Sequence, residues 1–166
     1  MSDVIVVSGP PGVGKTTVAW EMTDVLEERD IAFGFFDPDG IHFRPAEEGD
    51  PFNSRVWLAA LHAVWPLMAV ERLIVPVVVE ERGEAERLLP GANVTVARLT
   101  AATETLDERI RKREIGSGPG VDWHSTRAKE LQEHWQQHPA QDFVVETDRR
   151  GVRELALEVL TQSGWI

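Results

Sequence analysis

The sequence contains no cysteine and comparatively few basic residues. Without cysteine the chain has no disulfide and no thiolate metal ligand, and nothing in its composition indicates an oxidising compartment, so a cytoplasmic location is expected. Lys and Arg number 17 against 28 Asp and Glu, which gives a formal net charge of -11. This charge disfavours broad attraction to nucleic acid or anionic lipid, so neither partner is expected. A polyanionic ligand would need a local positive site.

Long apolar runs are also missing. The longest spans residues 57–70 and is interrupted by His62 and Pro66, whereas a bilayer span needs roughly 20 apolar residues. The amino terminus lacks the basic region and long apolar stretch of a signal peptide. We therefore expect no membrane partner, and one domain over residues 1–166, because domains commonly contain roughly 100–200 residues. A monomer and a homodimer are both compatible with the sequence.

Short apolar runs alternate with helical patterns along the chain, which predicts an α/β protein with a parallel sheet covered on both faces. Ligands of such sheets bind at the carboxyl ends of the strands. The expected strands span residues 3–8, 31–36, 73–79, 93–99 and 143–145. The expected helices run from residue 14 to about 30, over 53–71 with an interruption at Pro66, and over 81–89, 103–113, 123–137 and 152–160.

A phosphate-binding motif lies between the first strand and the first helix. Residues 9–16, Gly-Pro-Pro-Gly-Val-Gly-Lys-Thr, satisfy G-x-x-x-x-G-K-[ST] without substitution. Pro10 and Pro11 have no N–H group, so the phosphate cradle must use Gly12, Val13, Gly14, Lys15, Thr16 and Thr17. Lys15 is expected to reach the β- and γ-phosphates of ATP, and the Thr16 hydroxyl to ligate Mg²⁺.

Residues 9–17 resemble the phosphate loops of adenylate kinase and its P-loop kinase relatives. The resemblance extends loosely along the whole chain. It implies a three-layer α/β sandwich with a five-stranded parallel sheet, a helical lid at about residues 106–127, and an acceptor site after the second strand. The implied activity is ATP-dependent transfer of the γ-phosphoryl group to a hydroxyl of a small polar metabolite or antibiotic.

Two carboxylates follow the second expected strand. Asp37 is the preferred general base and a candidate Mg²⁺ ligand, and Asp39 is a candidate for binding the acceptor or a metal-bound water. The Asp37–Asp39 spacing is similar to the Asp-x-Asp of adenylyl-sulfate and gluconate kinases. Residues 32–37 resemble a strand of chloramphenicol phosphotransferase whose aspartate is thought to act as base. The sequence Asp-Pro-Asp-Gly is also favourable turn chemistry, so a structural role stays open for both residues.

The end of the third expected strand departs from the named subfamilies. It lacks the Asp-Gly-Phe-Pro-Arg of nucleoside monophosphate kinases and the glycine triplet of shikimate kinases. A nucleotide acceptor is therefore not expected. Glu80 takes the place of the usual aspartate near Mg²⁺, or is a solvated residue at the strand end.

Four arginines are candidates for binding anionic groups. Arg109 and Arg113 lie four residues apart on one helix, so they share a face that can close on ATP phosphates. The glycine-rich residues 114–121 that follow look like the lid loop of P-loop kinases, where arginines stabilise charge during transfer. A solvated helix is the alternative. Arg44 and Arg55 are candidates for holding an acidic acceptor, or are ordinary surface residues.

Two other functions remain open from the sequence. One is a nucleotide-binding switch or regulatory ATPase that signals to a protein partner, although the Asn-Lys-x-Asp guanine signature is absent. The other is a toxin-like kinase of a sugar nucleotide. Neither the acceptor nor the choice between ATP and GTP follows from the residues.

Overall fold

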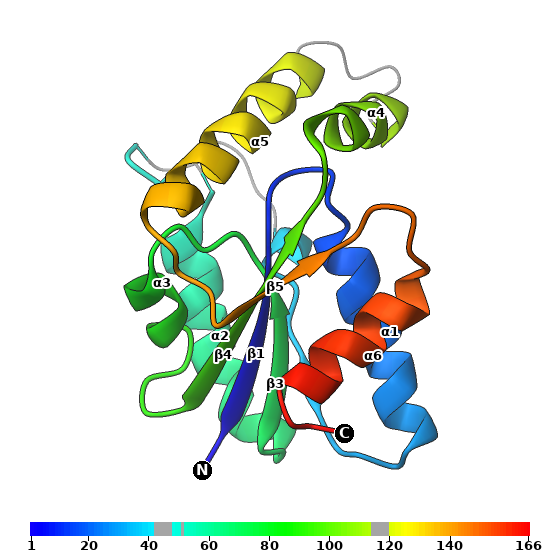
Figure 1. Ribbon diagram of the computed structural model, residues 1–166. Coiled ribbons are helices and arrows are strands. Elements are labelled where there is room, and N and C mark those ends of the chain that lie inside the picture. Colours follow the sequence, from blue (N-terminus) through cyan, green and yellow to red (C-terminus); the bar gives the residue numbers. More distant parts are fainter. Residues whose placement is uncertain (42–47, 51, 114–119) are drawn as a thin grey trace.

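The chain folds around a parallel sheet, as a computed structural model of residues 1–41, 48–50, 52–113 and 120–166 shows (Figure 1). In these residues the sheet has five strands in the order β2-β3-β1-β4-β5, and every neighbouring pair is parallel. The strands are β1 (Asp3–Ser8), β2 (Gly34–Phe35), β3 (Arg72–Pro76), β4 (Asn93–Thr100) and β5 (Phe143–Glu146). The predicted α/β class and five-stranded parallel sheet are confirmed.

Helices cover both faces of the sheet. They are α1 (Lys15–Glu28), α2 (Ser54–Met68), α3 (Arg82–Glu86), α4 (Thr103–Arg113), α5 (Gly120–Gln137) and α6 (Val152–Gln162), with a 3-10 turn η1 (Pro38–Gly40). α1 and α6 pack on one face, and α2 and α3 on the other. α4 and α5 lie beyond the carboxyl ends of the strands (Figure 1). Within the described residues, no helix combines the length and the hydropathy that a membrane span requires.

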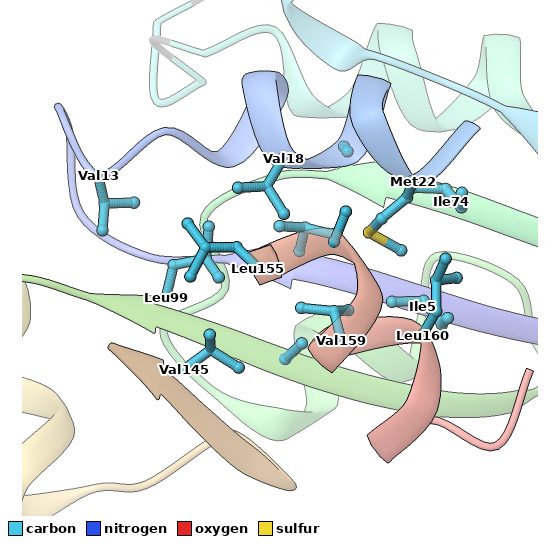
Figure 2. Close-up of a cluster of buried hydrophobic side chains, with 14 of the residues drawn as sticks. Ile5, Val13, Val18, Met22, Ile74, Leu99, Val145, Leu155, Val159 and Leu160 are labelled. Carbon is cyan, nitrogen blue, oxygen red and sulfur yellow. The ribbon is translucent and has the colours of Figure 1, made fainter. Parts of the chain in front are cut away.

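Alternate side chains of β1 enter the two cores. Ile5 and Val7 are fully buried in the core that α1 and α6 cover. Figure 2 shows Ile5 in this core, near Leu160 of α6. Val4 and Val6 belong to the opposite core, which includes Trp135 of α5. A strand whose residues are buried on both faces reads as a continuous apolar run, which is why the sequence pattern identified β1.

Two strands are shorter than predicted. The strand expected over residues 31–36 contains only Gly34 and Phe35, because the Ile31 N–H still donates to the Leu26 carbonyl (3.0 Å) in the turn that follows α1. The strand expected over residues 73–79 ends at Pro76. Proline has no N–H group for a ladder, and it occupies the last paired position, opposite Val7.

Two helix predictions were also wrong in detail. No interruption occurs at Pro66, which lies inside α2, and the helix ends two residues later at Met68. So close to the end of a helix, proline removes only one hydrogen bond of the last turn. The helix expected over residues 81–89 covers only α3, which begins at a capping box between Glu81 and Glu84.

Candidate active site

Glycine allows the phosphate loop to pack closely against its neighbours. Gly9 has φ 147°, and a Cβ there would lie 2.7 Å from the Leu99 carbonyl oxygen. Gly12 has φ 81°, and its Cβ would lie 2.8 Å from Ile110 Cγ1 of α4. Both φ values are in the region that side chains disfavour, and both positions lack space. The loop is therefore fixed between the end of β4 and the side of α4 that carries Ile110.

The amino end of α1 opens into a cavity. Its N-cap residue, Gly14, has φ 99°, and no side chain caps the helix in the described structure. The first N–H groups of a helix are positively polarised and have no partner within the helix, so they suit an anion. The cavity holds about 560 Å³, and its lining includes all six predicted cradle residues, Gly12, Val13, Gly14, Lys15, Thr16 and Thr17. We call it the nucleotide cavity.

The nucleotide cavity is electropositive, although the chain is acidic. Lys15, Arg109, Arg113 and Arg150 line it, against one carboxylate, Asp39, among the described residues. The Lys15 Nζ donates to the Pro10 carbonyl oxygen (3.1 Å). The pKa of Lys15 is lowered to about 8, mainly by burial and also by the nearby Arg113 charge, while the Asp39 and Asp37 charges oppose this shift. This is the local positive site that a polyanion would need.

Arg109 is held in place by the core of the protein. Its guanidinium donates to Thr147 Oγ1 (2.9 Å) and to the Val13 carbonyl oxygen (3.4 Å). The Asp148 carboxylate accepts a hydrogen bond from the Ala102 N–H (2.7 Å), just before α4. α4 is therefore tied to the phosphate loop and to the loop after β5.

Arg150 is a cavity residue that the sequence reasoning missed. It follows β5, lines the nucleotide cavity, and pairs with Glu154 and Glu158 of α6. Its position after the fifth strand, at the carboxyl edge of the sheet, was the available signal. The two carboxylates neutralise much of its charge, so Lys15, Arg109 and Arg113 supply most of the positive field.

A second cavity of about 640 Å³ adjoins the first, and we call it the acceptor cavity. Its lining comes from the phosphate loop, η1, the start of α2, the segment after β3, α3, α4 and α5. Lys15, Asp39 and Arg113 line both cavities. These three residues mark the place where a ligand in one cavity would meet a ligand in the other.

The two candidate carboxylates have different surroundings. One Asp37 oxygen accepts a hydrogen bond from the Asp39 N–H (3.0 Å), so Asp37 caps η1. Burial raises the pKa of Asp37, the nearby Asp39 charge adds to this rise, and the Asp39 N–H and Lys15 oppose it. Asp37 belongs to the lining of neither cavity, whereas Asp39 lines both. Asp37 thus caps the turn, and Asp39 is the one of the two that lines both cavities. The role of Asp37 as general base stays a prediction.

Glu80 lies on the acceptor side of the site. Its carboxylate pairs with Arg127 of α5, and it lines the acceptor cavity but not the nucleotide cavity. Next to it, the Trp135 Nε1 donates to the Val79 carbonyl oxygen (2.9 Å). Glu80 therefore helps to join α5 to the end of β3. The role of Glu80 as a Mg²⁺ ligand stays a prediction.

The remaining predictions fall in different places. Arg44 and residues 114–119 lie outside the described residues. Arg55 is an exposed residue at the start of α2, and its N–H donates to Asp50 Oδ2 (3.0 Å). Arg55 does not belong to the lining of the acceptor cavity. Within the described ranges, no three His, Asp or Glu side chains cluster as a metal site.

Comparisons with known proteins agree on the fold. No protein-family profile and no curated protein matches the sequence. Among solved structures, the tunicamycin resistance protein of Deinococcus radiodurans is similar, with a TM-score of 0.69 and 24% identity over 99% of this chain and 96% of that one. A gluconokinase from Sinorhizobium meliloti 1021 gives a TM-score of 0.64, with 20% identity over 98% and 92% of the two chains.

A third solved structure, the shikimate kinase of Acinetobacter baumannii in complex with shikimate, gives a TM-score of 0.58. Its identity is 18% over 98% of this chain and 92% of that one. Each likeness spans nearly both whole chains, so the match is not confined to the phosphate loop. The predicted P-loop kinase fold is confirmed. At these identities the comparisons establish the fold and leave the acceptor open.

Proposed function

We propose that the protein transfers the γ-phosphoryl group of Mg-ATP to a hydroxyl of a small-molecule acceptor. The observation that carries this proposal is the pair of adjoining cavities that share Lys15, Asp39 and Arg113. Phosphoryl transfer needs an electropositive site for the triphosphate, a second site for the nucleophile, and a point of contact between them.

In the nucleotide cavity the backbone N–H groups of residues 12–17 bind the phosphates. Lys15 lies at the junction, where its positive charge stabilises the negative charge of the phosphoryl group during transfer. Arg109 is fixed by Thr147 and the phosphate loop, so it supplies charge with little reorganisation. Arg113 lines both cavities and stabilises the charge that spreads over the γ-phosphoryl oxygens. Mg²⁺, held by the Thr16 hydroxyl and the phosphates, would neutralise further charge.

At the junction the acceptor hydroxyl attacks the γ-phosphorus. The new bond joins the acceptor oxygen to phosphorus, the bond to the β–γ bridging oxygen breaks, and ADP leaves with that electron pair. The hydroxyl proton passes to a carboxylate. Asp39 lines both cavities and is the better placed base, while Asp37 holds η1 in the conformation that presents Asp39.

The acceptor cavity favours a kinase over a nucleotide switch. A switch needs no small-molecule site beside the γ-phosphate, whereas the cavity of about 640 Å³ lies within the range typical of small-molecule pockets. Its mixture of apolar and charged walls also fits a ligand site rather than a protein-docking loop.

The test is ADP formation from Mg-ATP in the presence of hydroxylated small molecules, with Lys15→Ala as the inactive control. A kinase releases ADP in step with acceptor concentration, and the Lys15 variant does not. Tight nucleotide binding without acceptor-stimulated ADP release across a broad set of alcohols would contradict the proposal and favour the switch.

A further inference from the structure

Two exposed aromatic side chains face each other at the acceptor cavity. Phe52 precedes α2 and is 61% exposed, and Trp123 of α5 is 49% exposed. Their ring centroids lie 6.2 Å apart, with a tilt of 48° between the rings. Both side chains line the acceptor cavity, together with Trp57, Leu58 and Leu131. About half or more of each residue's surface thus remains exposed and available to a ligand, on a wall that is already apolar.

The charged wall of the same cavity is largely satisfied within the protein. Glu80 pairs with Arg127, and the Glu84 carboxylate accepts a hydrogen bond from the Glu80 N–H (2.7 Å). The described lining carries Lys15, Arg87, Arg113 and Arg127 against Asp39, Glu80 and Glu84. Since these charges nearly balance, this cavity has no strong preference for a polyanionic acceptor.

We infer that the acceptor is a hydroxylated compound without a large net charge that carries a flat apolar ring, and that this ring stacks on Phe52 and Trp123. The inference rests on the proposed function, because the hydroxyl must lie at the Lys15–Asp39 junction while the ring occupies the aromatic wall. A sugar acid alone would fill the polar junction and leave the aromatic wall uncovered. The aromatic pair therefore acts as a specificity element for the non-reacting part of the acceptor.

Two glucosides that differ only in the aglycone test this inference. We would measure the dissociation constants of 4-nitrophenyl β-D-glucopyranoside and methyl β-D-glucopyranoside for the protein saturated with Mg²⁺ and a non-hydrolysable ATP analogue. The aryl compound is expected to bind about 10-fold more tightly, because stacking on the aromatic wall removes apolar surface of its ring from water. Phe52→Ala and Trp123→Ala should each remove most of that preference.

Trp20→Ala is the matched control. Trp20 of α1 is 54% exposed and also contacts a phenylalanine, Phe35 (4.3 Å between centroids), but it lines neither cavity. This variant should keep the full preference for the aryl glucoside. All three side chains are exposed, so none of the substitutions should unfold the protein.

Two results would overturn the inference. One is a preference below about threefold in the wild-type protein, which includes undetectable binding of both glucosides. The other is a preference that survives in both aromatic variants. Failure of the proposed function is a separate observation, namely the absence of acceptor-stimulated ADP release from Mg-ATP, because the glucoside dissociation constants are measured with a non-hydrolysable analogue and need no phosphoryl transfer.

Discussion

The two cavities share a boundary but are built in different ways. The nucleotide cavity takes seven of its lining residues from one continuous segment, residues 12–18. The acceptor cavity draws on seven separate segments and is lined largely by side chains. A phosphate can be bound by the N–H groups of almost any residues, whereas an acceptor must be distinguished by its shape. The nucleotide cavity therefore relies on groups that almost any residue provides, whereas the acceptor cavity depends on the particular side chains of this protein.

Helix ends show the same contrast. At α2, the Asp50 carboxylate accepts hydrogen bonds from the Ser54 N–H (2.7 Å) and the Arg55 N–H (3.0 Å). At α1, no side chain of the described structure caps the helix, and the cavity begins there. The protein thus satisfies one helix end with a side chain and leaves the other without a side-chain cap, which is the arrangement that our proposed phosphate site requires.

The largest expected effect is at the junction of the cavities. Asp39→Asn removes the carboxylate that lines both, so the rate of phosphoryl transfer should fall about 100-fold or more, since general-base assistance contributes about 100- to 10,000-fold. The loose transition state of phosphoryl transfer favours the lower end of that range. The measurement is kcat for ADP formation with an acceptor, with the ATP dissociation constant as a check that should change little.

Asp37→Asn is the matched control for Asp39. Asparagine is also a good cap, so the amide oxygen can still accept from the Asp39 N–H, and the variant should keep most of its stability and transfer rate. The opposite result would be a fall of 100-fold or more in the transfer rate of Asp37→Asn while Asp39→Asn stays active. The general base would then be Asp37, which lies outside the junction of the two cavities.

The next effect concerns nucleotide binding alone. Mg-ATP at about 100 times its dissociation constant should stabilise the wild-type protein by about 2.7 kcal/mol, measured as a rise in melting temperature. Lys15→Ala should lose most of that rise, because it removes the charge at the junction. Lys129→Ala is the control, since Lys129 is 54% exposed and contacts only Asp107 (4.0 Å) among the described acidic groups. Equal shifts in Lys15→Ala and the wild type would refute the nucleotide assignment.

The sequence reasoning was strong for the first cavity and weak for the second, for a physical reason. The phosphate loop is contiguous, and its glycines are required by local φ values and by contacts with Leu99 and Ile110, so the motif contains the site. Phe52 and Trp123 meet only after α2 and α5 pack beside the sheet. No spacing in the sequence shows that they are neighbours, and an apolar residue reads as core wherever it occurs.

The sequence predicted the candidate carboxylates and arginines less completely than the phosphate loop and better than the aromatic pair. Asp37 and Asp39 were found as a pair, because both follow a strand at the carboxyl edge. Which of them caps the turn depends on one hydrogen bond, from the Asp39 N–H to Asp37, and no pattern of residues reveals it. Arg55 was chosen for its position after the second strand. Its N–H donates to Asp50, and Arg55 is not part of the described lining of the acceptor cavity, so its role in binding an acceptor stays a prediction.

A smaller effect should appear in the pH dependence of ATP affinity. The pKa of Lys15 is about 8 in the nucleotide-free protein, mainly through burial. A depressed lysine pKa means that the folded protein favours the neutral amine, and this destabilising contribution is fully present below pH 8 and is relieved as the pH rises towards 10.5. Bound phosphate favours the ammonium form instead, so binding above pH 8 must take up a proton.

ATP affinity should therefore be constant below pH 8 and should fall by up to about tenfold per pH unit above it. Titration calorimetry at several pH values gives the dissociation constants, and buffers of different ionisation enthalpy give the number of protons taken up. Lys15→Arg stays charged throughout this range, so its affinity should not depend on pH. A pH-independent wild type would show that Lys15 is not the phosphate ligand.

The smallest effect is expected at Glu80, on the far side of the acceptor cavity. Glu80→Gln breaks the ion pair with Arg127. Because the Glu80 side chain is 37% exposed and the Arg127 side chain 24% exposed, the unfolding free energy should fall by about 0.2–1 kcal/mol. The Trp135 Nε1 bond to the Val79 carbonyl still joins α5 to β3. Because Glu80 does not line the nucleotide cavity, the ATP dissociation constant should stay within about threefold.

Glu130→Gln provides the comparison for Glu80, because Glu130 also pairs with Arg127 (3.7 Å) but is 61% exposed and lies outside the acceptor cavity lining. If Glu80 only helps to hold α5, the two variants should differ by less than about 1 kcal/mol in stability and should transfer phosphate at similar rates. If Glu80 is a Mg²⁺ ligand, as the strand-end position suggested, Glu80→Gln alone should lower transfer by about 100-fold and raise the Mg²⁺ concentration required. Measuring kcat against Mg²⁺ concentration separates these outcomes, because a merely structural contact leaves the Mg²⁺ requirement unchanged.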